Sequence, residues 1–176
     1  GLRGVGKTVL LNQMEELAKK ESIECRHIEV ENRNDFISQI ITCCQVFLRS
    51  ISTGERMKQT ISKAVDALKS LAVSFSPESS TFSLSMQEQE LYKTTNLTQS
   101  LTDVFISVGE AARDANKPIC FFIDEMQYMK GNELSSLIAA LHRANQLNLP
   151  IMIVGAGLPK LYKMLAEEKT YTERLF

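Results

Sequence analysis

Apolar residues recur at helical spacing in six stretches of the chain. In the first, residues 8–20, one face carries Leu10, Met14, Leu17 and Ala18. The same spacing predicts helices over residues 37–51, 57–71, 97–108, 132–145 and 161–165. Asn34 and Asp35, just before the second stretch, have side chains suited to capping its helix.

Three other stretches have the pattern of β-strands. Residues 23–30 alternate loosely between apolar and polar positions, whereas residues 119–123 and 151–154 are continuously apolar, and each of these two runs follows a proline. Continuous apolar runs are typical of strands buried on both faces. Because such strands alternate with helices, the pattern predicts an α/β fold with a mostly parallel sheet.

A serine-rich segment, residues 70–86, interrupts this alternation. Two short alternating runs flank the turn at residues 77–80, and their apolar positions match as the two strands of a β-hairpin: Leu71, Val73 and Phe75 with Phe82, Leu84 and Met86. We therefore predict a hairpin insert around residues 71–86, with a flexible serine-rich linker as the alternative. The rest of residues 1–176 is predicted to be a single domain.

Composition and charge narrow the functional classes. Hydrophobic residues form 44% of the chain, enough for one domain to bury a core, and the net charge is −1. This balance indicates neither a nucleic-acid surface nor a polybasic membrane signal, and no apolar run is long enough to span a bilayer. The four cysteines contain no C-x-x-C pair, which favours reduced thiols in a cytoplasmic protein and argues against a metal cluster.

The first eight residues, Gly-Leu-Arg-Gly-Val-Gly-Lys-Thr, fit the phosphate-binding pattern G-x-x-x-x-G-K-[ST] at every fixed position. Glycines allow the backbone N–H groups to turn inward as a nest for phosphate oxygens. Lys7 supplies a positive charge for the β- and γ-phosphates, Thr8 a hydroxyl for Mg²⁺, and the following helix its positive dipole end. The alternative is a glycine-rich turn with a solvated lysine.

The buried run at residues 119–123 is followed directly by Asp124 and Glu125. In phosphate-loop ATPases an aspartate at a strand end helps to hold Mg²⁺, and a neighbouring acid can deprotonate the attacking water. We therefore expect Asp124 to bind the metal and Glu125 to be the general base. An acidic turn after a strand is the alternative, but the phosphate loop in the same chain favours the functional interpretation.

Further candidate site residues lie after the last predicted strand, on the helix predicted over residues 132–145, and near the end of the chain. That strand should lie beside the strand of Asp124, yet it ends in Gly155 and Ala156, so backbone N–H groups or Gln127 would have to replace a polar side chain that senses the γ-phosphate. We favour a tight turn before the next helix as the reason for Gly155 and Gly157. Arg143 and Arg174 are candidates for an arginine that acts on a neighbouring subunit's phosphates, or are surface charges.

Together these segments resemble the AAA+ ATPases, in particular the bacterial and archaeal ATP-binding proteins related to the origin-recognition ATPase and to STAND signalling NTPases. The resemblance rests on four segments: residues 1–11, 122–127, 141–144 and 154–159. It implies a three-layer P-loop NTPase fold and a Walker A loop that binds ATP. The nucleotide-binding residues would be Gly1, Leu2, Arg3, Gly4, Val5, Gly6, Lys7, Thr8 and Val9.

The resemblance also implies a Walker B segment ending at Asp124 and Glu125. The segment ending at Phe176 is similar to the family's box VII, which would make Arg174 the trans-acting arginine. Because Gly1 already begins the loop, we expect the chain to be a fragment at both ends, without the preceding strand and the following helical lid.

The expected function is Mg²⁺-dependent hydrolysis of ATP to ADP and phosphate, coupled to conformational change. Lys7, Glu125 and Arg174 would be the catalytic residues, and Thr8 and Asp124 the metal ligands. Expected partners are ATP, further copies of the chain through the trans arginine, and a protein or DNA client bound through regions outside these residues. The alternatives are a STAND-like nucleotide switch with slow turnover and the ATPase module of a DNA-binding protein with a winged helix.

Overall fold

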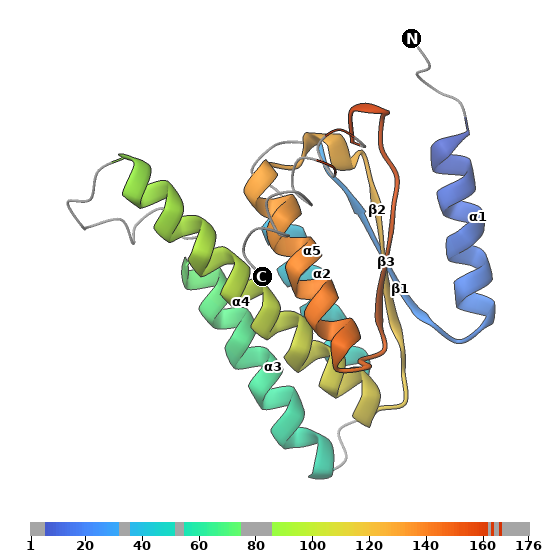
Figure 1. The fold of residues 1–176 in the computed structure, drawn as a ribbon. Helices are drawn as coiled ribbons and strands as arrows, with labels where there is room; N and C mark the ends of the chain where they lie inside the picture. The colour runs from blue at the N-terminus through green and yellow to red at the C-terminus, as the bar shows by residue number, and fades with distance from the viewer. Residues whose placement is uncertain are drawn as a thin grey trace.

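A computed structural model of the chain describes residues 6–31, 36–51, 55–74, 86–161, 163 and 166. Helices and strands alternate along it, as the apolar pattern predicted (Figure 1). In chain order the elements are α1 (Lys7–Lys20), β1 (Glu24–Glu29), α2 (Phe36–Ser50), α3 (Glu55–Ser74), α4 (Met86–Asp114), β2 (Ile119–Asp124), the 3₁₀ turn η2 (Met126–Tyr128), α5 (Gly131–Gln146) and β3 (Ile151–Gly155).

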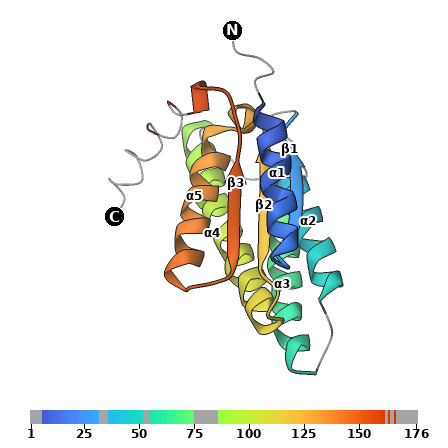
Figure 2. The same ribbon diagram turned by 90° about the vertical axis from the view of Figure 1, so that its right-hand side faces the viewer.

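The three described strands form one parallel sheet in the order β1-β2-β3 (Figure 2). Its register pairs Glu29 with Asp124 and Ile123 with Gly155, so the carboxyl ends of all three strands meet at one edge. The prediction of a mostly parallel sheet is confirmed, as is the prediction that the strand ending at Gly155 lies beside the strand of Asp124.

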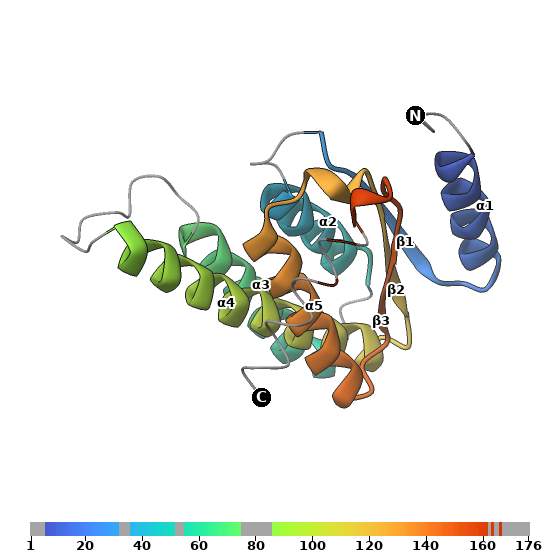
Figure 3. The same cartoon turned by 45° about the horizontal axis from the view of Figure 1, so that its top comes forward.

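The sheet lies between two layers of helices. Figure 1 shows α1 on one face and α2, α3, α4 and α5 on the other, and Figure 3 shows the same separation with the top of the molecule turned forward. This three-layer α/β arrangement agrees with the predicted P-loop NTPase fold. The first turn of α1 lies toward the same edge as the carboxyl ends of the strands, because α1 and β1 run in opposite directions (Figure 1).

Strand β2 is buried along its whole length because each face contacts a separate apolar cluster. Phe121 and Ile123 belong to the large core beneath α2, α3, α4 and α5, where the Phe121 ring stacks on Phe105 with centroids 6.0 Å apart. Cys120 and Phe122 point to the other face and pack with Leu11 of α1. The continuous apolar run therefore has the physical cause that the pattern predicted.

The hairpin prediction is wrong where the structure tests it. Leu71 and Val73 lie in α3, which continues to Ser74, and α4 already begins at Met86. Leu71 extends the helical series of Ala64 and Leu68, and all three side chains are buried, so packing against the core favours helix over a two-residue alternation. The remaining positions, 75–85, lie outside the described residues, as do Asn34 and Asp35.

Helix α4 is 29 residues long and packs along both α3 and α5. Its length exceeds the predicted stretch because the apolar face at residues 97–108 is preceded by a polar part of the same helix. Neither this helix nor any other in the described segments combines the length and apolar character needed to cross a membrane.

Candidate functional site

The site is built from the first turn of α1 and the turns that follow β2 and β3. Gly6 precedes α1 with φ of 65°, a left-handed conformation that glycine adopts without a Cβ clash. The first bond of the helix runs from the N–H of Leu10 to the carbonyl oxygen of Gly6, at 2.8 Å. The N–H groups of the preceding three residues lie in the first turn, where helices hold anions.

Thr8 and Asp124 meet although 116 positions separate them in the sequence. The Thr8 Oγ1 hydroxyl donates a hydrogen bond to Asp124 Oδ2 at 2.8 Å. The other carboxylate oxygen, Oδ1, accepts the backbone N–H of Glu125 at 2.8 Å, and the Asp124 side chain is buried. The structure thus brings together the two residues that were predicted to hold the metal.

Glu125 occupies an unusual backbone conformation directly after β2. Its φ of 56° and ψ of 35° lie in the left-handed region, which costs a non-glycine residue about 1–2 kcal/mol. Hydrogen bonds on both sides hold this conformation: the N–H of Tyr128 donates to the Glu125 carbonyl oxygen, and the N–H of Met126 donates to the carbonyl oxygen of Ala156, each at 3.0 Å. Strained residues of this kind concentrate at functional sites.

Gln127 connects this turn to the segment after β3. Its Nε2 amide donates to the Glu125 carboxylate at Oε2, and its Oε1 accepts the backbone N–H of Leu158 at 2.9 Å. The two turns lie close together here, because a Cβ on Gly157 would lie 2.9 Å from Gln127 Oε1, and a Cβ on Gly155 would overlap the Sδ atom of Met126. The turn after β2 and the segment after β3 are therefore in direct contact.

An open cavity of about 530 Å³ lies at this edge of the sheet. Its lining comes from five segments that the fold brings together: Lys7, Glu29, Val30, Glu31, Glu125, Tyr128 and Leu158. Among these described residues Lys7 is the single cation, and the carboxylates of Glu29, Glu31 and Glu125 line the same cavity. The volume suits a small-molecule ligand.

The structure places several of the predicted site residues together and leaves others untested. Lys7 and Glu125 share the cavity, and Thr8 contacts Asp124. Val9, predicted to bind nucleotide, follows in the first turn of α1 with its side chain 60% exposed. The other predicted nucleotide-binding residues, Gly1, Leu2, Arg3, Gly4 and Val5, lie outside the described residues, as does Arg174.

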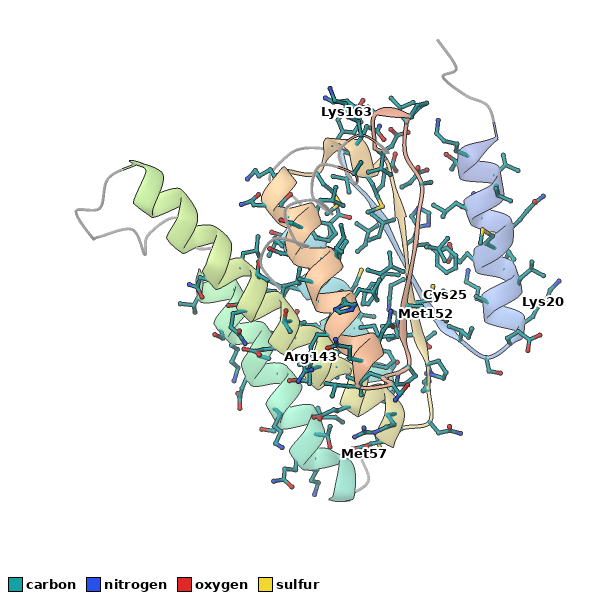
Figure 4. All side chains as sticks on the ribbon, in the orientation of Figure 1. Lys20, Cys25, Met57, Arg143, Met152 and Lys163 are labelled. Atoms are coloured by element: carbon teal, nitrogen blue, oxygen red, sulfur yellow. The ribbon has the colours of Figure 1, made fainter. Side chains whose placement is uncertain are left out.

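Arg143 lies away from this edge, in the exposed last turn of α5 (Figure 4). Because α5 runs back along the sheet from the turn after β2, its last turn lies beside the start of β2 rather than beside Asp124. The Arg143 Nη1 donates to Gln146 Oε1 at 3.1 Å. These contacts describe a solvated surface charge.

Sequence reasoning missed five of the residues that line the cavity. Glu29, Val30 and Glu31 come from the end of β1 and the residues directly after it, Tyr128 from η2, and Leu158 from the segment after β3. A signal for Glu29 and Val30 was available, since they are the last two residues of the strand predicted over residues 23–30 and strand ends of a parallel sheet meet at one edge. The other three depend on the exact turns taken by the chain.

The donor set fits a hard cation such as Mg²⁺. Thr8 and Asp124 offer hydroxyl and carboxylate oxygens, which Mg²⁺ prefers, and it takes its remaining ligands from water and phosphate. In the described part of the chain no group of three or more His, Cys, Asp or Glu side chains is placed to hold a metal.

The cysteines do not contribute to the site. All four are free thiols, and burial raises the pKa of each, for Cys120 to about 12. Figure 4 shows Cys25 between the sheet and α1, well below the edge that carries the cavity. These thiols are therefore protonated packing groups, as the sequence predicted.

Comparison with known proteins agrees with this geometry. None of the curated proteins matches the chain. The sequence model of a family described as the AAA ATPase domain matches residues 1–154, which include the loop at Thr8 and the acidic pair at Asp124 and Glu125. That match covers most of the chain, including β1, β2 and all of β3 except its last residue. The chain therefore belongs to the AAA ATPase domain family.

Proposed function

We propose that this domain binds ATP with Mg²⁺ at the cavity beside Lys7 and hydrolyses it to ADP and phosphate. Family membership supports ATP binding and hydrolysis in general. The observation that carries the specific proposal is the 2.8 Å hydrogen bond between Thr8 Oγ1 and Asp124 Oδ2. It joins the two predicted metal-binding residues, which lie 116 positions apart in the sequence.

In this proposal different residues of the chain bind the phosphates and accept the proton. Lys7 and the N–H groups of the first turn of α1 bind the phosphates, while Glu125 faces the same cavity as Lys7. Glu125 takes a proton from water as the water oxygen bonds to the γ-phosphorus, and the bond from the γ-phosphorus to the bridging oxygen breaks, so that ADP leaves with the electron pair.

Thr8 and Asp124 would hold the Mg²⁺ ion. The bound ion supplies positive charge that offsets the charge of the phosphate oxygens. The Thr8–Asp124 bond keeps both oxygen donors at one point beside the first turn of α1 before the ion arrives. Pre-arranged donors lose less conformational freedom when they bind.

A nucleotide-gated switch with slow turnover is the second candidate. It is favoured by the end of β3, where Gly155 and Ala156 present no polar side chain toward the neighbouring Asp124 strand. A protein client, a DNA client or further copies of the chain would then receive the signal, with Arg174 as the proposed trans-acting arginine. We propose a cytoplasmic location from the free thiols.

Steady-state ATP hydrolysis by native protein and by Glu125→Gln tests the enzyme proposal. The variant should bind ATP with native affinity and lose about 10²-fold or more in kcat, because the amide accepts no proton. Glu16→Gln, an exposed substitution of the same kind on α1, is the matched control and should retain native turnover. Equal turnover in native protein and Glu125→Gln would refute the enzyme and leave the switch.

The dependence of specific activity on protein concentration tests whether Arg174 of one copy completes the site of another. If Arg174 completes a neighbour's site, specific activity should rise with protein concentration, and Arg174→Ala should abolish the rise. Turnover that is independent of concentration and of Arg174 would refute the trans arginine while leaving Glu125 as the base.

A further inference from the structure

We propose that Gln127 is a positioning residue, which holds the Glu125 carboxylate in the cavity and ties it to the backbone after β3. The inference rests on the proposed function of Glu125 as the base and assigns it a partner. Two hydrogen bonds carry it: Gln127 Nε2 to Glu125 Oε2, and the Leu158 N–H to Gln127 Oε1 at 2.9 Å.

The chemistry of the partners determines how the Gln127 amide is oriented. The Leu158 N–H can only donate, so it must face the amide oxygen. The ionised Glu125 carboxylate can only accept, so it must face the amide nitrogen. A glutamine satisfies both at once, whereas a glutamate at position 127 would place two carboxylates together and a methionine would offer neither bond.

Packing holds the Gln127 side chain in this arrangement. It is 8% exposed, and Gly157 leaves the space that its Oε1 occupies, since a Cβ at Gly157 would come within 2.9 Å. Both ends of the amide are engaged with protein groups. Gln127 therefore acts on the phosphates through Glu125 and not as a direct sensor of the γ-phosphate.

The same contacts couple Glu125 to the strand beside its own. The turn after β2 and the segment after β3 share backbone bonds, from Met126 N–H to the Ala156 oxygen at 3.0 Å and from Ala156 N–H to the Ile123 oxygen at 2.8 Å. A shift of the segment at Leu158 would therefore pull on the Gln127 amide and move the Glu125 carboxylate. This route would make β3 responsive to the site without a polar side chain at Gly155 or Ala156.

Two variants test the pairing in the purified protein, with a third as control. Gln127→Met keeps the length of the side chain but makes neither hydrogen bond, and Gln127→Glu retains acceptance from Leu158 while repelling Glu125. Both should lower kcat about 10–100-fold, with the KM for ATP within about twofold of native, because a displaced base affects the chemical step. Gln99→Met on α4 is the matched control, since its exposed amide also donates to a carboxylate, Asp103 Oδ1 at 2.9 Å.

The exchanged pair provides a readout that does not depend on activity. In Glu125→Gln with Gln127→Glu, the amide at position 125 can donate to the carboxylate at 127, which still accepts from Leu158. Gln127→Glu alone should lower the thermal midpoint by several degrees, and the exchange should restore most of that loss. If residue 127 contributed only by packing and not by pairing with residue 125, the exchanged protein would be as unstable as Gln127→Glu.

The outcomes separate this inference from the proposed function. Native kcat in Gln127→Met, or no thermal rescue by the exchange, overturns the positioning role. If native protein shows no hydrolysis that depends on Glu125, the proposed enzyme fails, and the thermal rescue alone then tests whether the two side chains are paired.

Discussion

Gly155→Ala is the substitution that tests most directly how the two turns of the site fit together. Gly155 ends β3, and a Cβ built on it would overlap the Sδ atom of Met126, the residue directly after Glu125. Met126 is 7% exposed and belongs to the large core, so it has little room to withdraw. The added methyl must displace the Met126 side chain, and we expect the turn that holds Glu125 to shift with it.

The expected cost follows from core packing. An extra methyl in a filled interior typically costs about 1–3 kcal/mol, which for a chain of this size lowers the melting temperature by about 2–12 °C. Met126→Ala alone removes a buried side chain and should cost about 2–5 kcal/mol. In the double variant the alanine methyl enters the vacated space, so its cost should fall below the sum of the single costs by at least about 1 kcal/mol.

Urea unfolding of the native, single and double variants measures these costs, and ATP hydrolysis shows whether the turn has moved. Gly155→Ala should lose activity beyond its loss of folded protein. Gly109→Ala, on α4 and far from the cavity, is the control. The new Cβ would lie 2.8 Å from the Cβ of Leu149, so this variant should change stability without changing kcat. Strict additivity of Gly155→Ala with Met126→Ala would refute the contact.

Two further predictions concern buried titratable groups. Burial raises the pKa of the Glu133 carboxyl, so the native state binds its proton more tightly than the unfolded chain does. The stability of the native protein relative to Glu133→Gln should therefore fall as the pH rises from 4.5 through the raised pKa. Urea unfolding between pH 4 and 7 measures this, and a constant difference between the two proteins would contradict it. Burial also raises the pKa of the Cys44 thiol, and it raises the pKa of the Cys120 thiol to about 12. Both thiols should therefore resist a disulfide-exchange reagent at pH 8 until urea unfolds the protein. Rapid reaction in the native protein would contradict their burial.

The apolar pattern predicted the layers of the fold because burial on a sheet leaves a strong periodic signal. Residues 119–123 are continuously apolar since both faces of β2 are covered, and the structure confirms this. The same reasoning failed at Leu71 and Val73, because Leu71 also continues the buried helical series of Ala64 and Leu68. Short patterns fit both periods, and tertiary packing then decides between them.

The sequence allowed the prediction of those candidate residues whose own segment has a recognisable pattern. Thr8 and Asp124 could be expected to meet because each belongs to a segment whose residue types serve phosphate and metal binding, and the structure brings them to 2.8 Å. The contact between Gln127 and Leu158 gave no such signal. It depends on the left-handed conformation of Glu125, which turns the chain after β2 toward the segment after β3.

That conformation indicates what the turn is built to do. Four described residues other than glycine have positive φ, and three of them, Ser22, Asn116 and Asn148, lie in loops that follow helices. A glycine at position 125 would adopt the same φ at lower cost, yet it would remove a carboxylate that lines the same cavity as Lys7. The turn instead retains a glutamate and holds it with bonds to Asp124 and Gln127. A strained backbone fixed by its neighbours in this way favours a working carboxylate over a merely structural turn.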